Sequence, residues 1–139
     1  MKFLKSLNKQ SDITKADSAK DVSDLQKALS EIIAEGWRFE LALEKTLGRI
    51  DVMEAERLGR QYRYFSDKVR KAASTAGITC LDLTGHRYDI GMAVQAMNLE
   101  EFDEEEDLII SRMIEPVILC NGRVIKTGMV MLSRTATEI

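Results

Sequence analysis

The stretch of sequence that decides the fold lies in the last third of the chain and reads VILCNGRVIKTGMVML, from Val117 to Leu132. Two apolar runs flank the dipeptide Asn121-Gly122, and both of these residues tolerate the positive φ angles of a tight hairpin turn. The stretch therefore predicts a β-hairpin that turns at Asn121-Gly122.

Three segments upstream of this hairpin have the composition of strands. Residues 78–83 alternate and are rich in β-branched side chains, which favours a strand. Residues 92–99 are apolar without a clear period, so the pattern alone does not separate strand from short helix, and we favour a strand. Residues 108–118 read as the strand that leads into the hairpin, where Pro116 lacks an N–H and so restricts this strand to an edge or a bulge.

An acidic cluster occupies residues 100–107 and is interrupted only by Phe102. Such a run repels itself and stays solvated. It also lacks the alternating ligands and the fixed glycine of a calcium-binding loop. A solvated loop is therefore the preferred interpretation over a cation site.

The first half of the chain has the apolar period of helices. Residues 1–17 are polar and show no sustained period, so we expect a mobile tail there, with helical order beginning at Asp17 or Ser18. Gly36 falls inside the pattern and predicts either one bent helix or two abutting helices. The apolar residues of this part are Val22, Leu25, Leu29, Ile32, Ile33, Trp37, Leu41, Leu43, Leu47 and Ile50.

A second helix is predicted after Gly48, which weakens the end of the first. Asp51 followed by Glu54 has the form of a capping box, and Gly77 is well placed to end the helix in a left-handed conformation. The helix carries an apolar stripe on one face and most of its arginine and lysine residues on the other. The stripe comprises Leu58, Tyr62, Phe65, Val69, Ala72, Ala73 and Ala76.

These elements predict an α+β fold in which an antiparallel helical hairpin precedes a small β-domain. We divide the chain into a tail (1–17), a helical dimerisation region (18–76) and the β-domain (77–139). Two helices cannot fully cover their own apolar stripes, so pairing of two chains into a four-helix bundle is physically reasonable. The expected bundle core is Leu25, Leu29, Ile32, Trp37, Leu41, Leu58, Tyr62, Phe65 and Val69.

The composition narrows the class of partner. The chain of 139 residues is 45% hydrophobic and 31% charged. Its net charge of −3 gives no sign of the basic surface that binding to nucleic acid requires. No apolar run approaches the roughly 18 residues of a membrane span, and the first residues do not form a signal peptide. We therefore expect a cytoplasmic protein. Cys80 and Cys120 lack metal-ligand spacing and are interpreted as reduced, mostly buried thiols.

Residues that could carry catalysis are nearly absent from the sequence. His86 is the only histidine, stands beside Gly85 in a predicted turn, and has no nucleophile at a motif spacing. Residues 85–91 lack the spacing and the lysine of a phosphate-binding loop. We expect no enzyme, no metal and no cofactor. Four aromatic residues at helical spacing are interpreted as packing between the helices: Trp37, Tyr62, Tyr64 and Phe65.

The hairpin also resembles the C-terminal signature of GrpE, the nucleotide-exchange factor of DnaK-type heat-shock chaperones. The family pattern is roughly G-Y-x-L-x-G-R-x-L-R-x-A-x-V-x-V, and the residues that fit its spacing here are Gly122, Arg123, Ile125, Lys126, Val130 and Leu132. Upstream, residues 77–81 fit the family segment G-V-x-x-I, and Tyr88-Asp89 fits its aromatic-Asp pair. Departures occur at Val117-Ile118, Lys126 and Gly128, where the family has Gly-Tyr, Arg and Ala. The chain is similar to a distant, shortened relative.

The resemblance implies a homodimeric co-chaperone of the cytoplasm that serves protein folding and the stress response. In the family, the β-domain contacts the ATPase domain of the chaperone and stabilises an open state that releases ADP. The family also has a long N-terminal helix that pairs into a coiled-coil stalk, which we expect to be short or missing here. The partner-binding residues that the resemblance implies are Arg123, Lys126, Ile114, Leu132 and Gly122, the last in the turn itself.

Two other classes of function remain open at this stage. The first is a non-catalytic adaptor or scaffold subunit that keeps the GrpE-like fold and has lost exchange activity. The second is a small-molecule-binding regulator or an enzyme.

Overall fold

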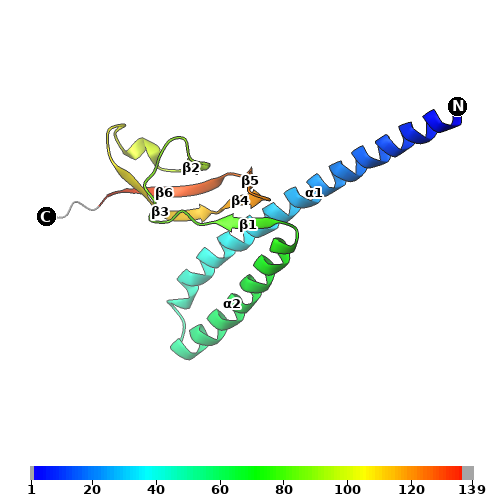
Figure 1. The fold of residues 1–139 in the computed structure, drawn as a ribbon. Helices are drawn as coiled ribbons and strands as arrows, with labels where there is room; N and C mark the ends of the chain where they lie inside the picture. The colour runs from blue at the N-terminus through cyan, green and yellow to red at the C-terminus, as the bar shows by residue number, and fades with distance from the viewer. Residues whose placement is uncertain (1, 136–139) are drawn as a thin grey trace.

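The computed structural model describes residues 2–135, with side chains from residue 14 onward, and shows two helices followed by a β-domain (Figure 1). This confirms the α+β class. The elements in chain order are α1 (Lys2–Leu47), α2 (Val52–Thr75), β1 (Ile78–Leu81), β2 (Val94–Ala96), the 3-10 helix η1 (Leu99–Glu101), β3 (Leu108–Glu115), β4 (Val117–Cys120), β5 (Arg123–Lys126) and β6 (Gly128–Arg134).

The helix α1 is much longer than the sequence pattern suggested. It runs from Lys2 to Leu47, so the predicted start at Asp17 or Ser18 is wrong. Its 46 residues span about 70 Å. The polar residues 2–17 contain no glycine or proline, the two residues that most disfavour a helix. A helix formed by the residues that follow can therefore extend through them.

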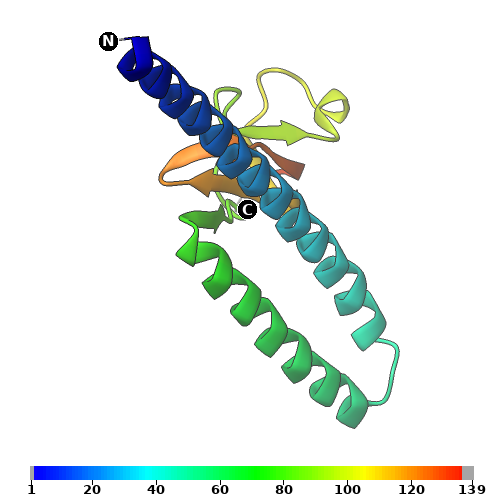
Figure 2. The same ribbon diagram turned by 90° about the vertical axis from the view of Figure 1, so that its right-hand side faces the viewer.

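The two helices form an antiparallel hairpin. Figure 2 shows α2 returning beside the second half of α1, and Figure 1 shows the N-terminal part of α1 extending beyond both α2 and the β-domain. Gly36 lies inside α1 and does not end the helix. The Tyr62 hydroxyl of α2 donates a hydrogen bond of 3.0 Å to the Gly36 carbonyl oxygen. The small residue at this position therefore stands where the second helix meets the first.

The predicted ends of the helices are largely confirmed. Helix α1 ends one residue before Gly48, and Asp51 is the N-cap residue of α2. The capping box is wrong in detail, because Asp51 makes no side-chain cap bond and Glu54 pairs with Arg57 at 3.0 Å instead. Gly77 follows the C-cap residue with a φ of 76°, the left-handed conformation expected of it.

Within residues 2–135, six strands form two three-stranded sheets. One sheet has the order β1-β4-β5 and is antiparallel throughout. The other has the order β2-β6-β3, in which β2 is parallel and β3 antiparallel to β6. The predicted strand over residues 108–118 is divided by Pro116 into β3 and β4, which belong to different sheets. Strand β2 lies inside residues 92–99, as favoured, and η1 follows it.

The predicted hairpin is confirmed, with a shorter second arm. Asn121 and Gly122 have φ angles of 50° and 82°, the signature of a type I′ turn between β4 and β5. After Thr127 the chain leaves this sheet, and β6 begins at Gly128 in the other one. The crossing is tight, since a Cβ at residue 128 would lie 3.0 Å from the backbone oxygen of Glu115.

Strand β4 connects two hydrophobic cores. Because successive side chains of a strand point to opposite faces, Ile118 enters the core against the helices and Val117 enters the core of the second sheet. The first core contains Ile33, Ala34, Ala73, Ile78, Ile118 and Cys120. The second contains Leu108, Ile110, Met113, Val117, Val130 and Leu132.

Replacing Ile118 by alanine tests the first core. Ile118 is fully buried, so Ile118→Ala should lower the free energy of unfolding by about 2–5 kcal/mol, through lost burial and the cavity left behind. Urea unfolding followed by circular dichroism measures this loss. Ile125→Ala on the neighbouring strand is the control, because Ile125 is 40% exposed and its truncation should cost far less. Equal losses would contradict the assignment of the core.

Candidate functional site

The β4-β5 hairpin presents two cations on the edge of its sheet. Arg123 is exposed beside the turn, and Lys126 at the other end of β5 is partly buried. Between them, Val124 and Ile125 are about half-exposed. Among residues 14–135, neither Arg123 nor Lys126 makes an ion pair. The hairpin thus offers free positive charge and apolar surface to a partner.

The other two implied contact residues do not join this surface. Leu132 is 3% exposed and packs in the core of the second sheet, so it is not available to a partner. Ile114 is partly buried on β3, also in the second sheet. The physical reason is the crossing at Thr127, which takes β6 out of the sheet that holds Arg123. Gly122, Arg123 and Lys126 remain together.

One face of α1 is apolar and only partly covered, since Leu29 packs against the first core and the Phe39 ring lies 6.2 Å from the Tyr62 ring of α2. The residues from Val22 to Leu43 follow alternating steps of three and four, which is the heptad spacing of a coiled-coil seam. We call this face the α1 seam. It comprises Val22, Leu25, Leu29, Ile32, Gly36, Phe39 and Leu43. Leu25, Ile32 and Phe39, seven residues apart, are 70%, 64% and 60% exposed.

The expected bundle core is only partly covered in a single chain. Three of its residues are exposed: Leu25, Ile32 and Phe65. The other six are partly buried: Leu29, Trp37, Leu41, Leu58, Tyr62 and Val69. A groove of about 340 Å³ runs between the helices, and its walls include Ile32, Phe39, Tyr62, Phe65 and Val69.

The predicted aromatic packing between the helices holds for Tyr62, whose ring lies 6.2 Å from the Phe39 ring of α1. Phe65 lies 6.4 Å from Tyr62 on the same helix and is 59% exposed. Trp37 instead packs against the β-domain, where its Nε1 donates a hydrogen bond of 2.9 Å to the Met113 carbonyl oxygen. Tyr64 is 67% exposed, with the Lys68 ammonium over its ring. Helical spacing alone did not separate the face toward α2 from the face toward the sheets.

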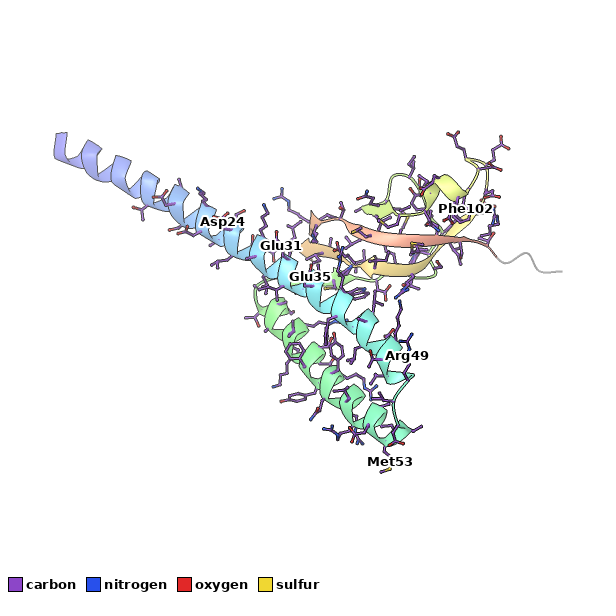
Figure 3. The ribbon with its side chains drawn as sticks, turned by 180° about the vertical axis from the view of Figure 1, so that it is seen from behind. Asp24, Glu31, Glu35, Arg49, Met53 and Phe102 are labelled. Carbon is purple, nitrogen blue, oxygen red and sulfur yellow. The ribbon has the colours of Figure 1, made fainter. Side chains whose placement is uncertain are left out.

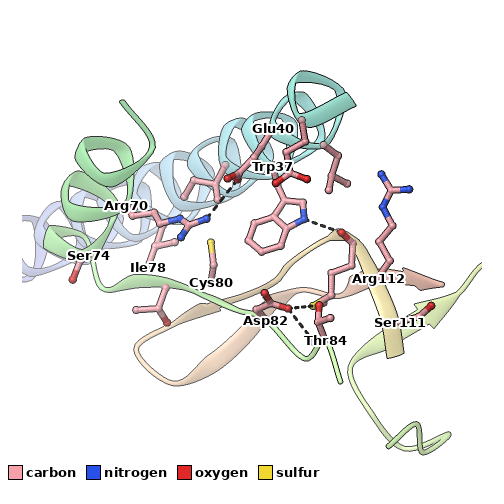
Figure 4. Close-up of a pocket in the computed structure, with 16 residues that line it drawn as sticks. Trp37, Glu40, Arg70, Ser74, Ile78, Cys80, Asp82, Thr84, Ser111 and Arg112 are labelled. Carbon is pink, nitrogen blue, oxygen red and sulfur yellow. Dashed lines mark hydrogen bonds and ion pairs between the residues drawn. The ribbon is translucent and has the colours of Figure 1, made fainter. Parts of the chain in front are cut away.

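A second groove lies between the helical hairpin and the β-domain, and the sequence pattern gave no sign of it. We call it the junction groove; its volume is about 460 Å³ (Figure 4). The Arg70 guanidinium stands 5.5 Å from the centre of the Trp37 ring, an arrangement that favours a cation over the aromatic face. A nitrogen of Arg70 lies 3.8 Å from a carboxylate oxygen of Glu40.

Burial changes the proton affinity of two groups in the junction groove. Partial burial raises the pKa of the Glu40 carboxyl; the charge of Glu44 adds to this rise, and Arg70 opposes it. Burial also raises the pKa of the Cys80 thiol, again opposed by Arg70. A thiol with a raised pKa is a poor nucleophile at neutral pH.

An ion pair ties α1 to β3. A nitrogen of Arg38 lies 2.7 Å from a carboxylate oxygen of Glu115, whose side chain is 10% exposed. A second nitrogen of Arg38 contacts the Met129 sulfur at 3.7 Å. The sequence held one signal of this contact, since Glu115 is a charged residue inside an apolar strand next to Pro116.

The acidic segment begins in η1, with Glu100 and Glu101, and continues as a loop, and two of its carboxylates are paired. Glu106 pairs with Arg134 at 3.1 Å, and Asp107 pairs with Arg87 at 2.9 Å. The Arg134 guanidinium also lies 5.0 Å from the centre of the Phe102 ring. Figure 3 shows Phe102 within the β-domain, far from the turn between the helices at Arg49 and Met53.

The remaining sequence candidates have ordinary surroundings. His86 is exposed in a turn. Cys80 is partly buried, Cys120 is buried, and both are free thiols. Within the described part of the chain, no group of three His, Cys, Asp or Glu side chains is arranged to hold a metal ion. Over their described residues, neither α1 nor α2 has an apolar stretch that would cross a membrane.

No family model, curated protein or solved structure matches this chain. The resemblance to GrpE therefore rests on the motif residues of the hairpin and on the order of the elements.

Replacing Glu40 by glutamine tests the electrostatics of the junction groove. Burial disfavours the ionised carboxyl, so Glu40 costs the folded chain free energy once the pH rises above its ordinary pKa of 4.5. Glu40→Gln should therefore gain stability over the wild type as the pH rises from 4.5 towards neutrality, and gain none below that value.

Urea midpoints measured across this pH range give the difference. Glu31→Gln, at an exposed position of α1 away from both grooves, serves as the matched control and should show no such trend. A difference of the opposite sign would mean that the pair with Arg70 outweighs the burial of Glu40.

Proposed function

We propose that the chain is a GrpE-like co-chaperone that promotes ADP release from a DnaK-type chaperone ATPase. One observation carries the proposal: a type I′ hairpin that packs against the long helix α1 exposes Arg123, at the position of the family arginine, with no ion pair to any described residue. An unpaired arginine at a sheet edge suits a carboxylate of a partner, which its guanidinium can bind through two hydrogen bonds.

The proposed mechanism involves no chemical step. The β-domain binds the open state of the nucleotide-binding domain more tightly than the closed state, and this difference in binding shifts the equilibrium towards the state that holds ADP poorly. By linkage, ADP weakens the complex by the same factor. A protein that acts in this way needs no catalytic residue, no metal and no cofactor.

The attachment of the β-domain to α1 suits this mechanism. The Trp37 hydrogen bond to Met113 and the Arg38–Glu115 ion pair hold one face of α1 against β3. A partner that contacts the hairpin therefore meets a surface whose orientation relative to the helices is already set. Such preorganisation lowers the conformational cost of binding.

We further propose that two chains pair through the α1 seam. The seam leaves Leu25, Ile32 and Phe39 largely in contact with water, and a second copy would remove this apolar surface from solvent. With α2 beside each copy of α1, the pair would form a four-helix bundle in the cytoplasm. The extended first half of α1 would supply a stalk.

The adaptor hypothesis also has an observation in its favour. Of the five residues that the resemblance implies for partner binding, only Gly122, Arg123 and Lys126 share one surface, while Leu132 is buried in the second sheet. Lys126 also carries an ammonium group where the family has an arginine, whose planar guanidinium can bind a carboxylate through two hydrogen bonds. A subunit that binds a different partner through the same hairpin would tolerate these differences.

An exchange assay tests the function. Release of fluorescent ADP from a purified DnaK-type chaperone should accelerate when the protein is added, and Arg123→Ala should reduce the acceleration about tenfold or more, as expected for a charged anchor residue. Arg60→Ala is the matched control, because Arg60 is exposed on α2 and far from the hairpin in sequence. Unchanged release with the wild-type protein would favour the adaptor hypothesis.

The mass in solution tests the dimer. Light scattering after size exclusion should give twice the chain mass of 15.7 kDa, and Ile32→Glu should give the single-chain mass because it places a charge in the α1 seam. Met53→Glu serves as the control, since Met53 is 78% exposed at the start of α2, outside the seam. A wild-type protein of single-chain mass at micromolar concentration would exclude the dimer.

A further inference from the structure

A third groove lies within the β-domain, between two loops. We call it the loop groove; its volume is about 1000 Å³. Residues 87–90 form one wall, and η1 with the loop after it, which projects from the β-domain in Figure 1, forms the other. The Tyr88 amide donates a hydrogen bond of 2.8 Å to the Leu108 carbonyl oxygen, which holds the first wall beside β3. None of the lining residues belongs to the β4-β5 hairpin, so this groove is separate from the surface around Arg123.

The loop groove has an apolar floor and an exposed aliphatic side chain at its rim. Tyr88, Phe102 and Leu108 line the groove and belong to the second hydrophobic core or pack against it. Leu99 is 41% exposed and Ile90 is 86% exposed, the highest value among the large apolar residues of the described chain. Removing such side chains from water is favourable. The groove therefore offers apolar surface that the chain itself leaves in contact with solvent.

The walls of the loop groove carry unbalanced negative charge. Arg87 is the only cation among the lining residues, and it is already paired with Asp107 at 2.9 Å. Glu106 is paired with Arg134 at 3.1 Å. Four further carboxylates line the groove and make no ion pair with any described residue: Asp89, Glu100, Asp103 and Glu104. Both cations near the groove are thus taken up, and the negative charge that remains is exposed.

The combination of apolar floor and acidic rim indicates the chemistry of the occupant. A bare metal ion does not fit, because no group of three carboxylates in the described part of the chain is arranged to hold one, and the apolar floor would stay uncovered. A purely apolar partner would leave the four carboxylates without a counter-charge. A segment that carries both an apolar side chain and cations is complementary to the floor and to the rim at once.

We propose that the loop groove binds a segment of another protein in which large apolar side chains lie next to lysine or arginine residues. The apolar side chains of the segment pack against Ile90, Leu99 and Phe102. Its cations lie beside the carboxylates of Glu100 and Glu104, where opposite charge speeds the encounter and sets the orientation of the segment. This binding does not depend on nucleotide exchange, since it uses a different part of the β-domain.

Three peptides test the proposed chemistry of the partner. The full-length protein, labelled with ¹⁵N, is titrated with acetyl-Ala-Lys-Phe-Lys-Leu-Lys-Ala-amide, and its amide signals are followed by NMR. In a second peptide glutamate replaces each lysine, and in a third alanine replaces Phe and Leu. We expect saturable shifts at Ile90, Leu99 and Phe102 with the first peptide, and binding about tenfold weaker for each of the other two. Salt at about 0.5 M should weaken the first peptide by screening the charges.

Two variants of the protein keep the test specific to the loop groove. Ile90→Ala should weaken the first peptide about tenfold through lost apolar contact. The double variant Glu100→Gln and Glu104→Gln should weaken it about fivefold and leave the glutamate peptide unweakened. Met53→Ala is the matched control, because Met53 is 78% exposed on α2, and it should change neither affinity.

Because Ile90, Glu100 and Glu104 are exposed, these variants should keep the circular dichroism of the wild type. Equal affinity for all three peptides, no binding of the first peptide up to about 1 mM, or shifts confined to residues outside the two loops would each overturn the proposal.

Discussion

The structure depends on the burial of β4 on both of its faces. Val117 and Ile118 are adjacent and almost fully buried, yet they belong to different hydrophobic cores. The helical hairpin packs on one side of this strand and the second sheet on the other. Pro116 precedes β4 and lies at the point where the chain passes from one sheet to the other. The short apolar strand therefore holds together two halves that share little other core.

Polar contacts between α1 and the β-domain fix the orientation of the helix on the sheets. Apolar contact alone is compatible with several helix orientations, whereas the Trp37–Met113 hydrogen bond and the Arg38–Glu115 ion pair are satisfied in one. Both contacts are partly buried, so breaking one partner would leave a polar group without compensation. This arrangement gives α1 one face toward the sheets and one toward α2, and it leaves part of the α1 seam exposed at Leu25, Ile32 and Phe39.

The surfaces that the helix leaves open follow from these constraints. Because Trp37 of α1 stands over β1 and bonds the Met113 carbonyl oxygen of β3, the space beside it becomes the junction groove. Because α2 covers only part of the apolar circumference of α1, Leu25, Ile32 and Phe39 remain exposed. Strand β5 lies on the far side of β4 from β1, so it is also an edge strand.

The sequence by itself determined the structural features that depend only on residues close together in the chain. The turn at Asn121-Gly122, the helix end before Gly77 and the apolar stripes of both helices depend on backbone conformation and on spacing, and each was predictable from the sequence. The length of α1 differs from the predicted one, although its cause is also local, because a polar composition does not by itself prevent a helix. Only the tertiary structure decided that β6 leaves the sheet of β5, that Leu132 is buried while Arg123 is exposed, and that Glu40, Arg70 and Cys80 share a groove. These depend on contacts between residues far apart in the chain, whose free energy is set by packing rather than by neighbouring residues.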